Sequence, residues 1–414
     1  MNKISNLQIF FIIIILGLIG RILAIFIYSD NALENEWAVI YHNYKVSGVF
    51  GYNVVVGDFF AVPKFAEAGE KVLPTVFMPP LYYQLIFLID KINNEFIKIT
   101  NLIIYIQLIL SIISIPIFYK LLNIINKSND KENLFLTFLF TLFPLNVYAP
   151  CQISSISLQI FLLLIFFYSI TKLTDFDNIR FLIVFSISSG LLILTRGEFV
   201  LFYLFTLIFF YLFYKKNFKA IIISFIVTLL IVSPYLYRNF KNFETFTLTK
   251  SFGYNLLKGN NYEFKVEGNA KFIEKTYPRS ELKIKTSNNY EIELDNFYKI
   301  KALEYIKENP KEFVFSYIFK TLSFLIIDFK SSYPNYYNFL HIIPKILIGI
   351  TSFFGAIISL KRKSFYQYLS IYYFLNIFLF SLFFILPRYS LILLPVQLIL
   401  SLNFYKFLIK KLSN

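Results

Sequence analysis

Cysteine and histidine are almost absent from this chain. A single cysteine, Cys151, excludes an intrachain disulfide and any metal site built from cysteines. The two histidines, His42 and His341, stand far apart in the sequence, which argues against a His-ligated metal. No internal repeat is visible either, so the inverted-repeat signature of secondary transporters is missing. We therefore expect no metal and no cofactor.

Charged residues are also scarce. They make up 16% of the 414 residues, whereas 57% are hydrophobic and 20% aromatic, and the mean hydropathy is +0.62. Apolar runs of about 20 residues recur along the chain, which is long enough to cross a hydrocarbon core of about 30 Å. This composition predicts an all-α, polytopic membrane protein.

The apolar runs predict about ten transmembrane helices. The first, 7–28, follows Lys3, but it is too long for the core of a signal peptide and no cleavage site follows it, so we expect a retained anchor. Segment 79–90 is too short to span and is expected to lie in the interface. The other apolar segments are 97–119, 133–149, 156–171, 179–195, 198–214, 218–237, 312–328, 339–360, 364–386 and 389–409.

Lysine and arginine in the loops predict the orientation. Loops 120–132, 172–180 and 215–219 are basic and share one side if 79–90 does not cross, and the positive-inside rule makes that side cytoplasmic. Loop 361–363 and the C-terminus fall on the same side if 312–328 is interfacial too. Twelve crossings would instead turn the basic middle loops outward. We prefer ten, in the inner membrane of a bacterium, with loop 29–96 facing the periplasm or exterior.

Three regions follow from this layout. They are a transmembrane region 1–240 with loop 29–96, a periplasmic loop region 241–311, and a transmembrane region 312–414. Within the second, 295–309 reads as a helix with Asp295 as its N-cap and a stop at Asn309-Pro310. The net charge of +15 is mostly lysine; it favours attraction to anionic membrane lipids rather than a nucleic-acid partner.

Arginine is rare, with seven residues against 33 lysines. Arg196, Arg238 and Arg388 are each expected at an external end of a span, where basic charge is disfavoured, and Arg21 lies about two turns inside the first. A guanidinium suits a phosphate well because it donates two parallel hydrogen bonds. Arg196, Arg238 and Arg388, at the ends of spans, are therefore candidate ligands of a lipid-linked phosphate. Salt bridges to Glu198 or loop acids, with snorkelling to headgroups, are the structural alternative.

Loop 29–96 gathers carboxylates beside the membrane. Glu36 begins a helix-like run, Glu36 to Tyr41, and Asp30 and Glu34 flank it. A carboxylate within reach of an acceptor hydroxyl is the usual general base for glycosyl transfer. The alternative is that these acids are favourable N-terminal charges of a juxtamembrane helix.

The order of these features resembles the bacterial GT-C membrane glycosyltransferases related to protein O-mannosyltransferases and the lipid A aminoarabinose transferase. The resemblance runs from about residue 10 to 405. The matching elements are Asn35-Glu36-Trp37-Ala38, Tyr44 to Gly48 with Gly51, Pro79-Pro80-Leu81-Tyr82-Tyr83, Leu194-Thr195-Arg196, Pro234-Tyr235-Leu236-Tyr237-Arg238-Asn239, Gly253-Tyr254-Asn255-Leu256, Gly259-Asn260-Asn261, and Arg388-Tyr389 before Pro395.

The resemblance implies transfer of a sugar from a polyprenyl-phosphate donor to a lipid, glycan or protein acceptor at the outer membrane face. Glu36 would be the lead base, with Asp30 and Glu34 as weaker candidates. Arg196, Arg238 and Arg388 would lie near the donor phosphate. Tyr82, Tyr254, Asn255 and Asn260 would contact substrate.

Two departures from the family pattern bear on the chemistry. Asn35-Glu36 replaces an acidic pair, and the loop near 149–157 lacks the acid that relatives often carry. A metal-bridging arrangement is therefore not expected, and we predict a metal-independent, inverting reaction. The competing classes are a polysaccharide polymerase or ligase, and a transporter or lipid-carbohydrate flippase, which would need polar residues along a path at mid-membrane depth.

Overall fold

The protein is helical almost throughout. The computed structural model describes residues 5–33, 36–53, 65–93, 96–127, 129–173, 178–214, 218–279, 281–282, 284, 287–333, 336–362 and 364–413. The apolar bundle consists of α1 (Asn6–Tyr28), α4 (Ile99–Ile125), α5 (Asp130–Leu142), α6 (Pro144–Tyr148), the short 3-10 helix η1 (Ala149–Cys151), α7 (Ile156–Lys172), α8 (Ile179–Thr195), α9 (Phe199–Tyr214), α10 (Phe218–Phe243), α15 (Phe339–Leu360), α16 (Phe365–Ser381), α17 (Pro387–Ile392) and α18 (Leu394–Leu412).

Each of the ten apolar segments expected to cross corresponds to a helix or to a broken run of helices. Among the described residues, four helices are by themselves long and apolar enough to cross a membrane: α1, α4, α10 and α15. A fifth results if α5 and Pro144–Cys151, bent by 55°, count as one span, and α7, α8 and Phe199–Phe213 are shorter apolar helices. The chain is therefore a polytopic α-helical membrane protein, as its composition predicts.

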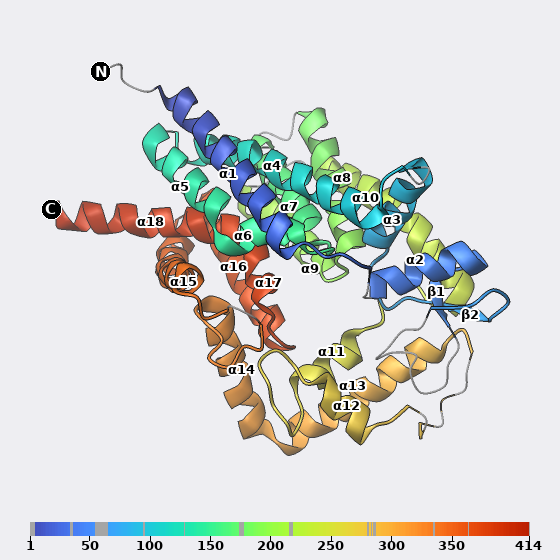
Figure 1. The fold of residues 1–414 in the computed structure, drawn as a ribbon. Helices are drawn as coiled ribbons and strands as arrows, with labels where there is room; N and C mark the ends of the chain where they lie inside the picture. Colours follow the sequence, from blue (N-terminus) through green and yellow to red (C-terminus); the bar gives the residue numbers. More distant parts are fainter. Residues whose placement is uncertain are drawn as a thin grey trace.

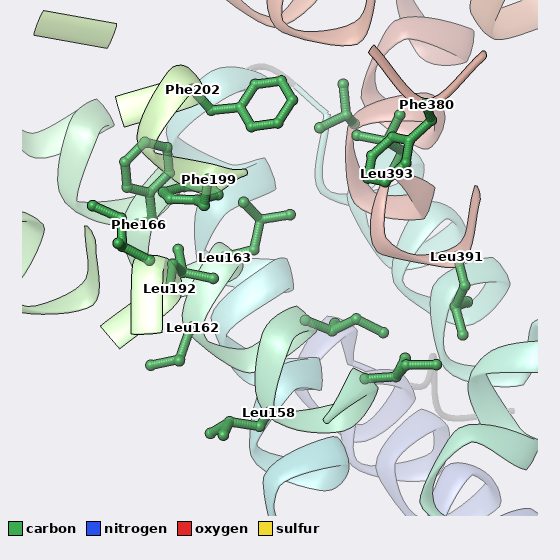
Figure 2. Packing of buried hydrophobic residues seen from close by; sticks show 14 of the residues in the cluster. Leu158, Leu162, Leu163, Phe166, Leu192, Phe199, Phe202, Phe380, Leu391 and Leu393 are labelled. Carbon is green, nitrogen blue, oxygen red and sulfur yellow. The ribbon is translucent and has the colours of Figure 1, made fainter. Parts of the chain in front are cut away.

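The core of the bundle is made mainly of leucine, isoleucine and aromatic side chains. Figure 2 shows Leu163, Phe166 and Leu192 packed with Phe199 and Phe202, and helices from the C-terminal part of the chain close the other side. Lipid tails are as apolar as these side chains, so close packing rather than the hydrophobic effect holds such helices together.

The break between α5 and α6 is stabilised by Arg21. Pro144 disfavours helical backbone at the residue before it and has no N–H for the helix ladder, so the helix ends there. The fully buried Arg21 donates from Nη1 to the carbonyl oxygens of Thr141 (3.0 Å) and Gly17 (3.1 Å), and from Nε to Ser111 Oγ (2.7 Å). Arg21 therefore satisfies a carbonyl at the end of α5, a structural role.

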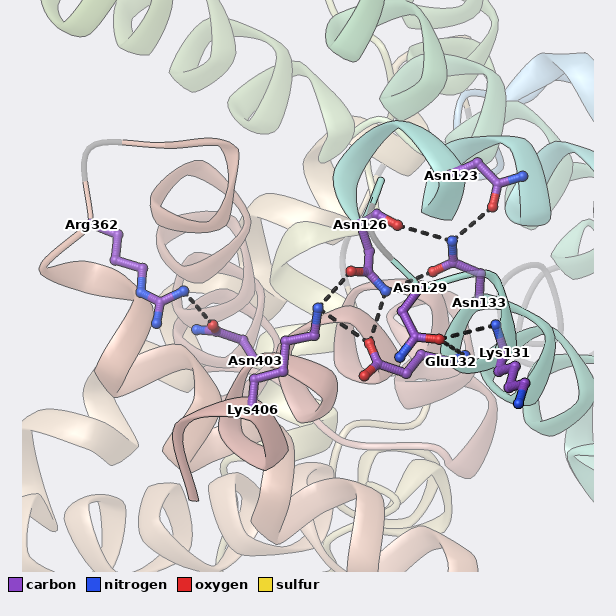
Figure 3. A network of polar contacts seen from close by, with 9 residues as sticks. All are labelled: Asn123, Asn126, Asn129, Lys131, Glu132, Asn133, Arg362, Asn403 and Lys406. Atoms are coloured by element: carbon purple, nitrogen blue, oxygen red, sulfur yellow. Dashed lines mark hydrogen bonds and ion pairs between the residues drawn. The ribbon is translucent and has the colours of Figure 1, made fainter. Parts of the chain in front are cut away.

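The basic loops meet on one side of the molecule. Lys406 Nζ lies 2.5 Å from Asn126 Oδ1 and 3.2 Å from Glu132, and Arg362 donates to Asn403 Oδ1 at 2.6 Å (Figure 3). Because these residues come from 120–132, from the end of α15 and from the C-terminal helix, the structure confirms that these three basic clusters share one side.

Helix α14 (Pro310–Leu325) does not reach that side. Its last residue, Leu325, places its carbonyl oxygen against Gly349, where a Cβ would overlap it. From Gly349, α15 continues to Leu360, roughly 16 Å further at 1.5 Å per residue. Helix α14 therefore ends well short of the basic face, and that 312–328 does not cross stays a prediction.

The first loop contains α2 (Glu36–Ser47), strands β1 (Gly51–Asn53) and β2 (Val72–Pro74), and α3 (Pro80–Asn93). The two strands pair antiparallel with Gly51 opposite Pro74. They were not expected from the sequence. A Cβ at Gly51 would overlap the Leu73 carbonyl, so the pairing requires glycine there. The expected interfacial helix is α3, and it begins at the second proline of the pair, where the missing N–H costs nothing.

Region 241–311 contains α11 (Phe252–Gly259), α12 (Ala270–Thr276) and α13 (Tyr290–Glu308), which gather at one end of the molecule (Figure 1). Helix α13 ends at Asn309-Pro310 as predicted, but the prediction that Asp295 caps its start is wrong. The helix begins five residues earlier, and the buried Asp295 carboxylate accepts the backbone N–H of Tyr254 at 3.0 Å. Asp295 therefore anchors α11 to α13.

Candidate functional site

Glu36 is the first residue of α2, and the rest of that helix is held firmly. The buried Trp37 ring packs edge-on against Tyr82 at 5.0 Å, and the Tyr82 hydroxyl donates to Gln107 Oε1 at 2.8 Å. Glu36 itself is half-buried. Among the described residues, no hydrogen bond or ion pair occupies its carboxylate. Within the described part of the chain, the structure thus presents an unengaged carboxylate on a well-packed helix.

Burial is the main influence on the pKa of two groups of α11: it brings the pKa of the Tyr254 phenol to about 12 and lowers that of the Lys258 ammonium below its ordinary value. The charge of the Glu36 carboxylate adds a smaller effect and raises the pKa of both groups. Glu36 and α11 are therefore coupled electrostatically, and we treat them together as the candidate site.

Asp30 has a different environment. Its carboxylate accepts the backbone N–H of Ile153 at 2.7 Å, and its own N–H donates to the Cys151 carbonyl at 3.0 Å. Asp30 thus joins the end of α1 to the loop before α7. Glu34, the third predicted acid, lies outside the described residues.

Arg196, the residue that ends α8, lines a cavity. Its Nε donates to Glu198 at 2.5 Å, and its guanidinium lies 5.2 Å from the Phe380 ring and 4.9 Å from the Tyr389 ring. The cavity is small, about 30 Å³, and is also lined by Gln159, whose buried Oε1 has no hydrogen-bond partner among the described residues. Arg196 is thus partly neutralised and stacked, and it supports the segment that carries Tyr389.

Arg238 lies away from the other two arginines. It donates to the backbone oxygens of Thr75 (2.7 Å) and Phe50 (3.0 Å) and to Asn239 Oδ1 (2.8 Å). These contacts hold both sides of the β-hairpin against the end of α10. The structure gives Arg238 a supporting role in the first loop.

Arg388 is exposed on α17, and Lys258 lies near it. The Lys258 Nζ is 4.3 Å from the centre of the Phe384 ring, and Phe384 packs on Tyr389 at 5.9 Å. Arg388 lowers the pKa of Lys258, as expected for a like charge nearby. We call Lys258 and Arg196, which lie against residues 380–389, together with Arg388 within that segment, the basic rim.

The predicted substrate-contacting residues fall into two groups. Tyr254 and Asn255 are half-buried on α11, and the Tyr254 ring lies between those of Phe77 and Tyr298, at 6.0 and 5.8 Å. Tyr82 and Asn260 are buried and fully engaged: Tyr82 with Gln107, and Asn260 with the carbonyls of Leu256 and Leu382, both at 2.8 Å. The latter pair supports the site from beneath.

Besides Lys258, two buried ionisable residues, Glu291 and Lys320, were not predicted from the sequence. The buried Glu291 accepts Thr75 Oγ1 at 2.6 Å and the Val76 N–H at 2.7 Å, and burial raises its pKa to about 7. The buried Lys320 donates to Asn260 Oδ1 and the Phe383 carbonyl, both at 2.9 Å. Neither stands in a motif, so their contacts emerge only from the fold. Within the described part of the chain, no group of three or more His, Cys, Asp or Glu residues could hold a metal ion.

Comparison with known proteins identifies the fold. No family model and no curated protein matches the sequence. Among solved structures, the oligosaccharyltransferase of Archaeoglobus fulgidus tethered to an acceptor peptide with the NVT sequon superposes with a TM-score of 0.56 and 14% identity, over 99% of this chain and 50% of that one. The same enzyme, AglB, with an inhibitory peptide and a dolichol-phosphate gives 0.54 and 14%, over 98% and 50%. ArnT from Cupriavidus metallidurans bound to undecaprenyl phosphate gives 0.42 and 11%, over 94% and 77%.

The chain thus spans about half the length of the archaeal enzyme. Nearly all of it follows the fold of that enzyme. The expectation of a GT-C-like fold in a polytopic helical membrane protein is confirmed.

Proposed function

We propose that this protein is a membrane glycosyltransferase that moves a sugar from a polyprenyl-phosphate donor to a lipid, glycan or protein acceptor. The observation that carries the proposal is the Glu36 carboxylate at the start of the well-packed α2, which no hydrogen bond or ion pair occupies among the described residues and whose charge acts on Lys258 of the basic rim. The GT-C fold adds support, as does AglB, an oligosaccharyltransferase whose structure contains a dolichol-phosphate.

Glu36 acts as the general base. It accepts the proton of the acceptor hydroxyl while that oxygen forms a bond to the anomeric carbon of the sugar. The bond from that carbon to the phosphate oxygen breaks, and its electron pair leaves with the polyprenyl phosphate. Attack opposite to the leaving phosphate inverts the anomeric configuration. Asp30 is less suited to this role, because a backbone N–H already occupies its carboxylate.

The three candidate arginines have different roles in this reaction. Arg388, exposed beside the site, binds the donor phosphate. Arg196 supports Tyr389 from below, and Arg238 holds the first loop in place. Tyr254 and Asn255 on α11 contact the sugar or the acceptor. The reaction is metal-independent, and it takes place on the periplasmic or exterior side of a bacterial inner membrane.

The experiment is sugar transfer by the purified protein in lipid nanodiscs, with a panel of radiolabelled polyprenyl-phosphate sugars and extracted membrane acceptors. Transfer from one donor, with a product of inverted anomeric configuration, supports the proposal. Retained configuration would overturn the direct displacement. A failure of every donor, together with growth of existing glycan chains or movement of lipid-linked sugar across the bilayer, would favour the polymerase or the flippase instead.

A further inference from the structure

Lys258 is the one lysine of the basic rim, and its residue type did not single it out because lysine is common in this chain. Among the described residues it also has no acidic partner bonded to it. It lies half-buried on α11, and its ammonium rests on the face of Phe384. In the described part of the chain, no hydrogen bond or ion pair engages its Nζ. An ammonium placed in this way keeps its three donors free for a ligand.

The position of Lys258 relative to Arg388 is fixed by bonds between their two segments. Asn260 Nδ2 donates to the Leu382 carbonyl at 2.8 Å, and the Ile385 N–H donates to the Val266 carbonyl at 2.8 Å. Lys320 joins Asn260 and Phe383 from below. The end of α11 and the segment leading to Arg388 thus form one rigid unit.

Close backbone approach maintains this unit. A Cβ at Gly259 would overlap the Phe383 carbonyl, and one at Gly253 would overlap the Asp295 carbonyl. Gly253 and Gly259, near the two ends of α11, therefore allow this helix to lie directly against 382–384 on one side and against α13 on the other. Lys258 takes its place from this packing.

The charges around this unit are unbalanced. Arg196 is paired with Glu198, whereas Lys258 and Arg388 have no carboxylate bonded to them among the described residues. Glu36 is the acid whose charge acts on Lys258, and in the proposed reaction it takes up a proton and becomes neutral. Two positive charges then remain beside the leaving group.

We propose that Lys258 and Arg388 together bind the phosphate of a polyprenyl monophosphate, and that their two positive charges balance the negative charge of the departing group. This inference rests on the proposed function and names its donor class. A sugar joined through a monophosphate carries a single negative charge, and the released monoester carries about two at neutral pH. Two cations thus bind the product-like state better than the donor, which is the condition for lowering the barrier. A diphosphate donor would leave one charge uncompensated.

The experiment measures equilibrium binding of undecaprenyl phosphate to the protein in nanodiscs. It uses wild type, Lys258→Gln, Lys258→Arg and the control Lys299→Gln. Lys299 is a matched control because its ammonium also lies over a phenylalanine ring, that of Phe252 at 5.9 Å, but on the exposed face of α13. Undecaprenyl diphosphate, inorganic phosphate and phosphatidylglycerol are tested as competitors.

We expect Lys258→Gln to weaken undecaprenyl phosphate binding about tenfold or more, since a charge-assisted hydrogen bond to phosphate is lost. Lys258→Arg should restore most of it and Lys299→Gln should leave it unchanged. Undecaprenyl phosphate should compete better than the diphosphate, and far better than phosphatidylglycerol or inorganic phosphate.

Equal binding by wild type and Lys258→Gln, or a preference for the diphosphate, overturns this inference and leaves the glycosyltransferase proposal intact. Equal competition by inorganic phosphate or phosphatidylglycerol would reduce the rim to a general anion site, which also overturns it. Absence of any polyprenyl phosphate binding by wild type would contradict the proposed function itself.

Discussion

Arg238 and Glu291 both bind Thr75, Arg238 through its backbone carbonyl and Glu291 through its side-chain hydroxyl. Arg238 donates to the Thr75 carbonyl at 2.7 Å, and Glu291 accepts the Thr75 hydroxyl at 2.6 Å. One residue comes from the end of α10 and the other from α13, about 50 positions later. The segment that leads into α3 is therefore held between the bundle and the outer helices, and the first loop depends on both.

Replacing Arg238 should weaken the fold rather than donor binding. Arg238→Gln loses hydrogen bonds to two backbone carbonyls, that of the buried Thr75 and that of the half-buried Phe50, a cost of about 1–3 kcal/mol in the free energy of unfolding. Thermal unfolding in detergent should show a lower midpoint, with undecaprenyl phosphate affinity unchanged below that midpoint. Normal stability with weakened affinity would return Arg238 to the role of a phosphate ligand.

Glu291 should make stability pH-dependent. Burial raises its pKa from an ordinary 4.5 to about 7 in the folded protein, so the folded state binds the proton more tightly than the unfolded state does. Its contribution to stability is complete below about pH 4.5 and is lost as the pH rises through about 7, by at most about 3 kcal/mol.

Thermal unfolding of wild type and Glu291→Gln between pH 5 and 8 measures this effect. The wild-type midpoint should fall relative to that of the variant as the pH rises, because glutamine cannot titrate. Parallel curves for the two proteins would show that Glu291 is charged in the fold.

Arg21 should matter for the α5–α6 break alone. Arg21→Leu leaves the Thr141 carbonyl without its donor inside the bundle, and we expect a loss of roughly 1–3 kcal/mol. Because Arg21 lies within α1, away from the basic rim, undecaprenyl phosphate affinity of the folded fraction should not change. A loss of affinity at full stability would contradict this assignment.

Glycine 259 should be essential for the placement of α11. Gly259→Ala forces the helix away from the Phe383 carbonyl, so Lys258 and Arg388 separate and undecaprenyl phosphate binding should fall at least as far as in Lys258→Gln. Gly20→Ala is the matched control, since its nearest neighbour, Val147, would be in ordinary contact at 3.8 Å. Full binding by Gly259→Ala would show that the unit tolerates displacement.

The membrane bundle could be predicted from sequence because each span is a long apolar run, and lysines mark the ends of several. Glu36 could be singled out because it begins an aromatic helix in an otherwise polar loop. The short strands could not, since the pairing of Gly51 with Pro74 joins segments about 20 residues apart without a tight-turn signal.

The helix start at Tyr290 was missed for a similar reason. Asp295 has the chemistry of a cap, but its carboxylate is needed by the Tyr254 N–H of a distant helix. Lys258 was hidden among the other lysines because its partners, Phe384 and Arg388, lie more than 120 positions later. Only the packing of α11 against 382–384 brings them together.

The central claim is that Glu36 is the base of a glycosyl transfer, and Glu36→Gln tests it most directly. Transfer rate and undecaprenyl phosphate affinity are measured side by side on wild type, Glu36→Gln and the control Glu304→Gln, a surface residue of α13 paired only with Lys301 among the described residues. The account predicts that Glu36→Gln loses about 10²-fold or more in rate while affinity is kept, and that the control matches wild type. An undiminished rate in Glu36→Gln would contradict it.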